Sequence, residues 1–312
     1  MLLLPSYRSG SWLMWLVGVL FLSGGATGCR HEQYAALEEA GRTPVDGHYM
    51  LRDPDRIYHL PDDLEEISGL TWWKDNQLVC VQDEDGKLFL FDTETGKVTA
   101  EHKFGKDGDY EGVEVVGDRV YVTKSNGTLY EISAWETDDP HVRTHKTFLD
   151  DDNNVEGLGY DPAADALLLA CKSKPGVKAD DKVRSIYRFR RATETLEEEP
   201  WRLIHYPEVI DSLKAHNWLR TTEQQFQCRP SGVAVHPLNQ KLYVLASTGK
   251  LLLVFDPQGN LEAVHPLNPR RFEQPEGICF APNGDLYISN EGDDKGPNIL
   301  LFRYEARPSA DQ

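Results

Sequence analysis

A short phrase that recurs five times constrains the fold of this chain more than any other feature. Each copy places a glycine at the start of an apolar stretch: ISGLTW, YEGVEV, VEGLGY, PSGVAV and PEGICF. The glycines follow one another at steps of 43, 45, 75 and 45 residues and are Gly69, Gly112, Gly157, Gly232 and Gly277. A period of about 40 to 50 residues that carries several strands is typical of the blades of a β-propeller.

Each period reads as four β-strands. The first one shows a strand over 78–82, an Asp-Gly hairpin turn and a strand over 87–92. A more polar fourth strand precedes the next glycine: KVTAEHKF, HVRTHKTFL, PWRLIHYP and LEAVHPL. The last repeat lacks this strand, and residues 55–61 (DRIYHLP) can supply it, since ring closure removes exposed edges. The sequence therefore predicts an all-β fold, a five-bladed β-propeller of four-stranded antiparallel blades closed by an N-terminal strand.

Two insertions lengthen the third repeat. Residues 173–184 widen a hairpin that the other blades close tightly. Residues 207–227 carry apolar side chains at roughly helical spacing, which predicts a helix that lies against the blades as a lid or brace.

The N-terminus reads as a targeting segment. Arg8 precedes an apolar run over 12–22, and small residues then lead to Cys29, the pattern of an export signal. The motif Ala-Thr-Gly-Cys resembles a bacterial lipobox, which implies that Cys29 becomes the lipidated N-terminus; an ordinary cleaved signal with an incidental cysteine is the alternative. Arg30 after this cysteine favours, by resemblance to enterobacterial lipoproteins, an outer-membrane location facing the periplasm.

The expected domain organisation follows from these patterns. It consists of a lipoprotein signal peptide over 1–28, a polar tether over 29–46, the propeller over 47–307 with its insertion at about 173–227, and a tail over 308–312.

The composition narrows the possible partners. The chain has 33 Lys and Arg against 51 Asp and Glu, a net charge of -18, which disfavours nucleic acid and favours cations, although an acidic surface also serves solubility. Cys80, Cys171 and Cys279 lie in apolar strand patterns, so we expect buried free thiols there, while the pairing of these and Cys228 stays open.

The residues before the glycines form a column that predicts a site. The first strands of a propeller surround its channel, so we expect these side chains to ring one mouth: Ser68, Glu111, Glu156, Ser231 and Glu276. The second strands run back to that mouth and end at Asp83, Lys124, Lys172, Ala246 and Asn290.

Carboxylate and amide oxygens are the ligands that calcium prefers, so the mouth is a candidate calcium site. Its candidate ligands are Asp83, Glu111, Glu156, Glu276 and Asn290. The alternative is a structural ring of ion pairs, in which Lys124 and Lys172 neutralise the acids.

The repeated motifs EISGLTWW, DYEGVEV, NVEGLGYDP, PSGVAVHP and QPEGICFAPNGDLYISNEGD resemble the SdiA-regulated family of exported bacterial proteins, which is similar to NHL-repeat propellers. The resemblance covers residues 55–307 and implies a five-bladed propeller with a bound calcium ion. A weaker likeness to gluconolactonase and regucalcin-type propellers rests on the Glu-Gly pairs and on Asn290 and Asp293.

Three functions are compatible with these features. The first is a calcium-binding envelope lipoprotein with a binding or maintenance role, whose partners are the membrane and an unknown small molecule or envelope protein. The second is a metal-dependent hydrolase of lactones, esters or phosphoesters with Glu111 or Glu156 as base. The third is a protein-interaction scaffold. A metal site that faces a substrate pocket would separate the second from the others.

Overall fold

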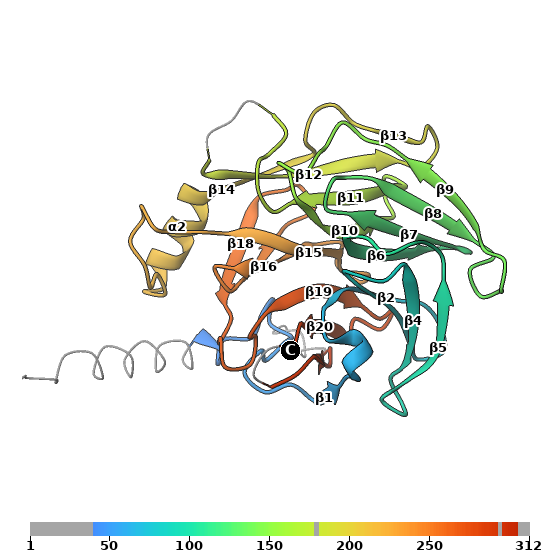
Figure 1. Ribbon diagram of the computed structural model, residues 1–312. Coiled ribbons are helices and arrows are strands. Elements are labelled where there is room, and N and C mark those ends of the chain that lie inside the picture. The colour runs from blue at the N-terminus through green and yellow to red at the C-terminus, as the bar shows by residue number, and fades with distance from the viewer. Residues whose placement is uncertain (1–39, 178–180, 293–294, 305–312) are drawn as a thin grey trace, which may run out of the picture.

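The computed structural model describes residues 40–177, 181–292 and 295–304. These residues form five antiparallel sheets arranged in a ring, so the predicted five-bladed propeller is confirmed. The innermost strands β2, β6, β10, β15 and β19 surround the centre in Figure 1, and β5, β9 and β18 lie toward the rim. The predicted signal peptide, the tail and most of the tether fall outside the described residues.

The strands follow the repeat in order. The first blade contains β2 (Ile67–Trp72), β3 (Gln77–Gln82), β4 (Lys87–Asp92) and β5 (Lys97–Lys103). The second contains β6 (Tyr110–Val116), β7 (Arg119–Lys124), β8 (Leu129–Ser133) and β9 (His141–His145). The third contains β10 (Val155–Asp161), β11 (Ala166–Cys171) and β12 (Val183–Arg190), and β12 pairs with both β13 (Thr195–Leu196) and β14 (Arg202–His205). The fourth contains β15 (Arg229–Val235), β16 (Leu242–Thr248), β17 (Leu251–Phe255) and β18 (Leu261–Pro266).

The fifth blade closes the ring. It combines β19 (Pro275–Phe280), β20 (Leu286–Asn290) and β21 (Asn298–Phe302) with β1 (Arg56–His59) from the other end of the sequence. Strand β1 runs antiparallel to β21, with Arg56 opposite Leu301. The prediction that residues 55–61 supply the closing strand is therefore confirmed. A short 3-10 helix, η1 (Asp62–Leu64), then leads into β2.

The recurring glycines are required because the inner strands approach one another closely. A Cβ atom on Gly112 would lie 2.7 Å from Cβ of Leu158 and 2.9 Å from the carbonyl oxygen of Glu156 in the next blade. A Cβ atom on Gly232 would lie 2.8 Å from the carbonyl oxygen of Glu276. A larger residue at these positions would push neighbouring blades apart.

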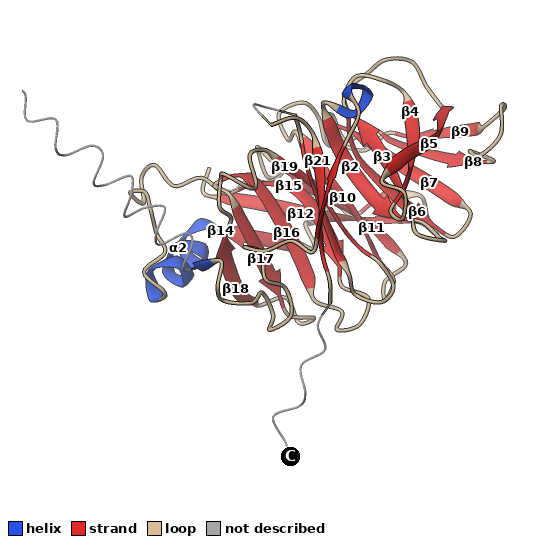
Figure 2. Cartoon of the chain, turned by 90° about the horizontal axis from the view of Figure 1, so that it is seen from below, coloured by secondary structure: helices blue, strands red, loops and turns tan. Residues whose placement is uncertain are grey.

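The insertion before the fourth blade is only partly helical. Helix α2 covers Tyr206–Ala215 and lies outside the ring of strands (Figure 2). The predicted helix over 207–227 is thus wrong beyond residue 215: Asn217 adopts a left-handed conformation with φ of 55°, which ends the helix. The remaining residues return along the blades as a loop that is anchored by buried Phe226.

Two further observations concern the cysteines and the helices. All four described cysteines are buried and free, as expected for Cys80, Cys171 and Cys279. Within the described ranges, no helix combines the length and apolar character needed to cross a membrane.

Candidate functional site

The side chains before the five glycines reach the channel mouth because each one lies in a β-bulge. The pairing between the first and second strand of every blade shifts register at this position, from Ile67/Gly69 in the first blade to Pro275/Ile278 in the fifth. A bulge leaves one residue outside the regular ladder and redirects its side chain. The column predicted from the sequence is therefore a ring of bulge residues.

The two serines of the ring connect adjacent blades. Ser68 donates a hydrogen bond to the carbonyl oxygen of Tyr110 at 2.7 Å, and Ser231 donates one to the carbonyl oxygen of Pro275 at 2.8 Å. Both hydroxyl groups are buried and bridge from one inner strand to the next. Serine at these two positions therefore links one blade to the next by a hydrogen bond.

The three glutamates share a buried environment with one lysine. Lys172 Nζ lies 2.5 Å from Glu156 Oε1, and the Glu156 and Glu276 side chains are buried. Burial lowers the pKa of Lys172, but the negative charges of Glu156, Glu276 and Glu111 outweigh this effect and raise it overall. Lys172 is therefore the internal counterion of the ring.

One ammonium group does not balance three carboxylates. Burial, followed by the charge of Glu156, raises the pKa of Glu111 to about 9 and that of Glu276 to about 8. Burial also raises the pKa of Glu156, although Lys172 opposes the shift. Glu156 Oε2 is buried and makes no hydrogen bond. At neutral pH the ring therefore retains protons that a bound cation would displace.

The second lysine that the sequence suggested does not join the ring. Lys124 Nζ lies over the ring of Tyr110, 4.7 Å from its centroid. The expectation that Lys124 and Lys172 both neutralise the acids is thus correct only for Lys172. Stacking on a neighbouring aromatic ring competes for the ammonium group, and the spacing of the repeats does not reveal it.

Asp83 belongs to a second acidic group at the junction of the first and last blades. Burial, a hydrogen bond with Glu66 and the charges of Glu66, Glu291 and Glu84 raise the pKa of Asp83 to about 7. The backbone holds this junction together: Asp83 N–H donates to the Glu66 carbonyl at 3.3 Å, and Gly292 N–H donates to the Glu65 carbonyl. The sequence column missed Glu66, which lies in the loop before β2.

Asn290 is fully buried at the end of β20, and its amide is only partly satisfied. Its Nδ2 group donates to Asn298 Oδ1 at 2.9 Å and to the Arg271 carbonyl at 3.3 Å, while Oδ1 has no hydrogen-bond partner. Asp83 Oδ1 is likewise buried without a partner. Buried oxygens without a partner are uncommon in folded proteins, and carboxylate and amide oxygens are the donors that calcium prefers.

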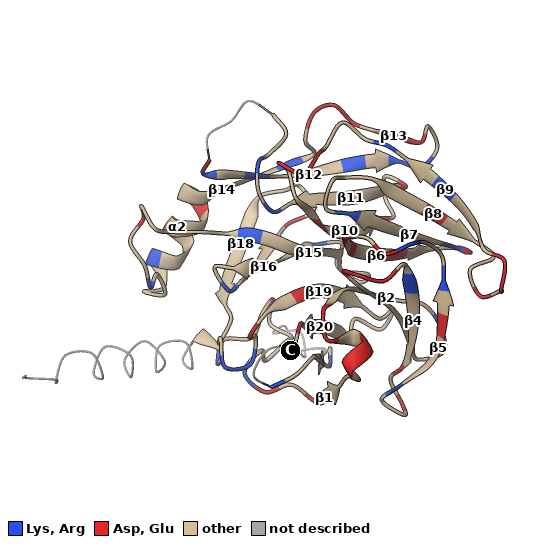
Figure 3. Ribbon diagram, viewed as in Figure 1, with Lys and Arg blue, Asp and Glu red and all other residues tan. Residues whose placement is uncertain are grey.

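The space between the ring residues is small. The cavity bounded by Glu111, Glu156 and the neighbouring inner-strand residues has a volume of about 10 Å³. Such a cavity has room for about one water molecule. Among the described residues, no three His, Cys, Asp or Glu side chains converge closely enough to hold a metal ion, so ligation by the acids requires rotamer changes. Figure 3 shows acidic and basic residues interspersed on every blade around this centre.

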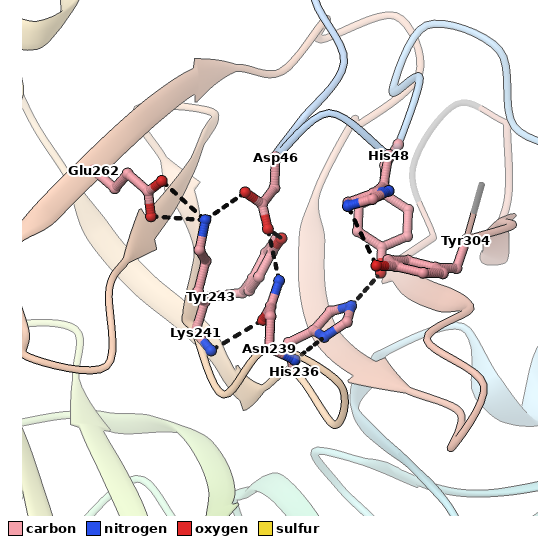
Figure 4. Close-up of polar contacts among 9 residues, drawn as sticks. Asp46, His48, His236, Asn239, Lys241, Tyr243, Glu262 and Tyr304 are labelled. Carbon is pink, nitrogen blue, oxygen red and sulfur yellow. Dashed lines mark hydrogen bonds and ion pairs between the residues drawn. The ribbon is translucent and has the colours of Figure 1, made fainter. Parts of the chain in front are cut away.

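The opposite end of the propeller carries a polar network that the sequence did not reveal (Figure 4). Asp46 Oδ1 lies 2.5 Å from Lys241 Nζ, and Asp46 Oδ2 accepts a hydrogen bond from Asn239 Nδ2 at 2.7 Å. Val45, Asp46 and Tyr49 belong to a segment, residues 44–51, that we call the N-terminal strap. It packs on the fourth and fifth blades, so the predicted tether boundary near residue 46 falls inside a packed segment.

His236, which follows strand β15, holds this strap in place. Its Nδ1 atom accepts hydrogen bonds from the backbone N–H groups of Leu238 and Asn239, so Nε2 carries the proton and donates it to the Tyr49 hydroxyl at 2.7 Å. Tyr49 in turn donates to the Gly284 carbonyl at 2.5 Å. Burial lowers the pKa of His236 to about 4, which keeps the imidazole neutral.

Five four-stranded blades around a carboxylate-lined mouth define the protein as a five-bladed β-propeller. The model of the SdiA-regulated family matches residues 57–300. The chain therefore belongs to the SdiA-regulated family.

Solved structures of other propellers resemble the fold. Glutaminyl cyclase of Myxococcus xanthus is 14% identical, with a TM-score of 0.55, and the match covers 82% of this chain and 97% of that one. The PQQ-bound aldose sugar dehydrogenase of Streptomyces coelicolor is 11% identical, with a TM-score of 0.49, over 81% of this chain and 98% of that one. At these identities the likeness concerns the fold alone. A search of the curated proteins finds no match.

Proposed function

We propose that this protein is a binding propeller of the cell envelope that holds a calcium ion at the carboxylate mouth. The ion would lie on the side of the first and last blades and take oxygens from Asp83, Glu276 and Asn290, with Glu66 and Glu291 close by. The observation that carries the proposal is the pair of buried oxygens without partners, Asp83 Oδ1 and Asn290 Oδ1, among acids whose pKa values are raised.

The charge distribution favours this side of the mouth. On the other side, Lys172 already pairs with Glu156 and supplies a positive charge. The neighbouring charges that raise the pKa of Asp83 are Glu66, Glu291 and Glu84. Carboxylate and amide oxygens in flexible positions suit calcium better than magnesium, which demands a near-ideal octahedral site. Glu156 then stays paired with Lys172, and Glu111, whose pKa is raised, stays outside the ligand set.

The small central cavity favours a binding role over hydrolysis at the ring. A space of about 10 Å³ between the glutamates does not admit a lactone, an ester or a phosphoester beside Glu111 or Glu156. The calcium ion would therefore join neighbouring blades across the mouth and stabilise the face that binds a partner.

Calorimetric titration of the purified protein with calcium tests the proposal. We expect one ion per chain, with release of protons at about pH 7, because binding replaces the protons held by Asp83 and Glu276. Asp83→Asn and Glu276→Gln should each weaken binding about tenfold or more. Glu114→Gln is the matched control: this half-buried carboxyl also has a raised pKa but lies farther along β6, where Thr71 donates a hydrogen bond to it at 2.7 Å.

Thermal unfolding gives a second measurement of the same event. Calcium at about 100 times its dissociation constant should stabilise the folded protein by about 2.7 kcal/mol. The absence of both heat and stabilisation at millimolar calcium would refute the proposal. Binding that survives Asp83→Asn and Glu276→Gln would place the ion elsewhere.

We further propose that the chain is anchored to the outer membrane through a lipid on Cys29, facing the periplasm. The support is the signal-like segment before Cys29 and Arg30 after it, both outside the described residues. Cys29→Ala should release the protein from the membrane fraction, and mass spectrometry of the wild-type N-terminal peptide should show the diacylglyceryl cysteine. An unmodified cysteine would contradict the anchor.

A further inference from the structure

The insertion between the third and fourth blades builds a pocket at the edge of the mouth. Its volume is about 350 Å³, within the range of small-molecule sites. Leu213 of α2, Trp218 and Leu219 line it on the insertion side, and Leu251 and Leu267 line it on the side of the fourth blade. This wall is mainly apolar, and the described loops of the four other blades contain no equivalent insertion.

Several contacts hold the insertion wall in position. Helix α2 ends at Ala215, Asn217 is left-handed, and the Trp218 N–H group donates to the Leu213 carbonyl at 2.7 Å, which turns the chain back over the pocket. The Trp218 ring stacks on His216 with a centroid distance of 4.6 Å. Farther along, Phe226 packs edge to face on Tyr206 at 5.3 Å. The pocket is thus preformed.

Positive groups stand at the open end of the pocket. Arg220 lines it and is exposed, and no ion pair of its guanidinium occurs within the described chain. Lys250 lines it as well; its Nζ donates to the Glu273 carbonyl, and its charge opposes the rise in the pKa of Glu276, which places the pocket beside the ring. The protein has a net charge of -18, so two cationic side chains at one apolar pocket contrast with its overall charge.

The Trp218 wall also covers a buried polar group that has no partner. The His265 ring lies 6.2 Å from the Trp218 ring, is 6% exposed, and has no hydrogen bond to either nitrogen. Burial lowers the pKa of His265 to about 4, so the imidazole is neutral. Buried polar groups without partners are uncommon in folded proteins.

We propose that this pocket binds a small amphipathic anion. Its aromatic or short aliphatic body would lie against Trp218 and Leu219, and its acidic group would meet Arg220, with the charge of Lys250 nearby. The apolar wall favours the body, and the two cations select an acid over a neutral compound of the same size. This site is separate from the proposed calcium ligands and does not depend on them.

Fluorescence titration with two probes tests the pocket. The anionic probe is 8-anilinonaphthalene-1-sulfonate, the neutral one is N-phenyl-1-naphthylamine, and octanoate is the competitor. We expect one saturable site for the anionic probe that octanoate empties. Arg220→Gln should weaken binding of the anionic probe about threefold and leave the neutral probe unchanged, since one exposed charge is lost. Trp218→Ala should weaken both probes about tenfold.

Two features keep the test decisive. Lys146→Gln, which removes an exposed positive charge in the second blade, is the matched control and should leave both probes unaffected. If Trp218→Ala disturbs folding, Arg220→Gln still separates charge recognition from general apolar binding, because its side chain is at the surface. Probe binding that octanoate does not reduce, or that Arg220→Gln leaves unchanged for both probes, would overturn the proposal.

Discussion

Replacement of Lys172 by methionine is the most direct test of the charge arrangement at the mouth. Lys172 Nζ lies 2.5 Å from Glu156 Oε1, and the Glu156 side chain is 5% exposed while that of Lys172 is 23% exposed. Loss of one partner from a buried ion pair costs about 3–5 kcal/mol. Because part of Lys172 is exposed and Glu156 can take up a proton, we expect about 2–3 kcal/mol at about pH 8. That loss corresponds to a fall in melting temperature of roughly 4–12 °C.

The cost of this substitution should depend on pH. The folded-state pKa values of Glu276 and Glu111 are raised from 4.5 to about 8 and about 9. Between pH 4.5 and these raised pKa values, the folded state binds more protons than the unfolded state. The free energy of unfolding therefore falls as pH rises through this range. At about pH 5 Glu111 and Glu276 are protonated, and burial makes Glu156 easier to protonate, so Lys172→Met should cost less there than at about pH 8. Removal of Lys172 steepens the fall toward high pH.

Urea denaturation at several pH values measures both effects. Lys174→Met is the matched control, since Lys174 Nζ pairs with Asp152 at 2.6 Å but the two side chains are 64% and 67% exposed. An exposed pair contributes about 0–1 kcal/mol, so this variant should cost little at any pH. Lys172→Arg should retain most of the stability. The reasoning is refuted if Lys172→Met costs no more than Lys174→Met, or if its cost does not change with pH.

Three other outcomes follow from the contacts described. Tyr49→Phe removes the hydroxyl that joins the strap to His236 and Gly284 and should cost about 1–2 kcal/mol in urea; an unchanged midpoint would show that the strap is not held by this bond. Gly112→Ala places a Cβ atom 2.7 Å from Leu158 Cβ and should cost about 1–3 kcal/mol, whereas a melting temperature equal to that of the wild type would contradict the close approach of the blades. Ellman's reagent should not label the four buried thiols in the folded protein and should label them in urea; labelling under native conditions would show local opening.

The fold was predictable because its strongest determinant is local and repeated. The glycines recur because each inner strand must approach its neighbour closely. This steric requirement falls at the same position in every blade. The closing strand was recognisable because the last repeat lacks a partner that residues 55–61 supply. The end of α2 was not recognisable, because a left-handed Asn217 terminates a stretch whose apolar spacing continues to suggest a helix.

The candidate site was only partly predictable for a related reason. The repeat places Glu111, Glu156 and Glu276 at equivalent bulges, so their convergence follows from the fold. Side-chain partners depend on neighbours that do not repeat, and Tyr110 draws Lys124 away from the ring. The strap was missed because Asp46 contacts Lys241, a residue 195 positions away, and no local pattern encodes such a pair.

On the two proposals above, opposite ends of the propeller would serve binding and attachment. The bulge residues stand at the start of the inner strands, where the α2 pocket also opens, while the strap packs on His236 and Gly284, which follow the ends of β15 and β19. On the proposed lipid anchor, the chain runs from Cys29 to Asp46, a span of at most about 60 Å when extended. Residues 44–51 pack on the end of the propeller opposite the mouth, so less of this span is free to reach a membrane. The membrane would therefore lie nearer the strap end, and the acidic mouth with its cationic pocket would face the solution, where soluble ligands reach it.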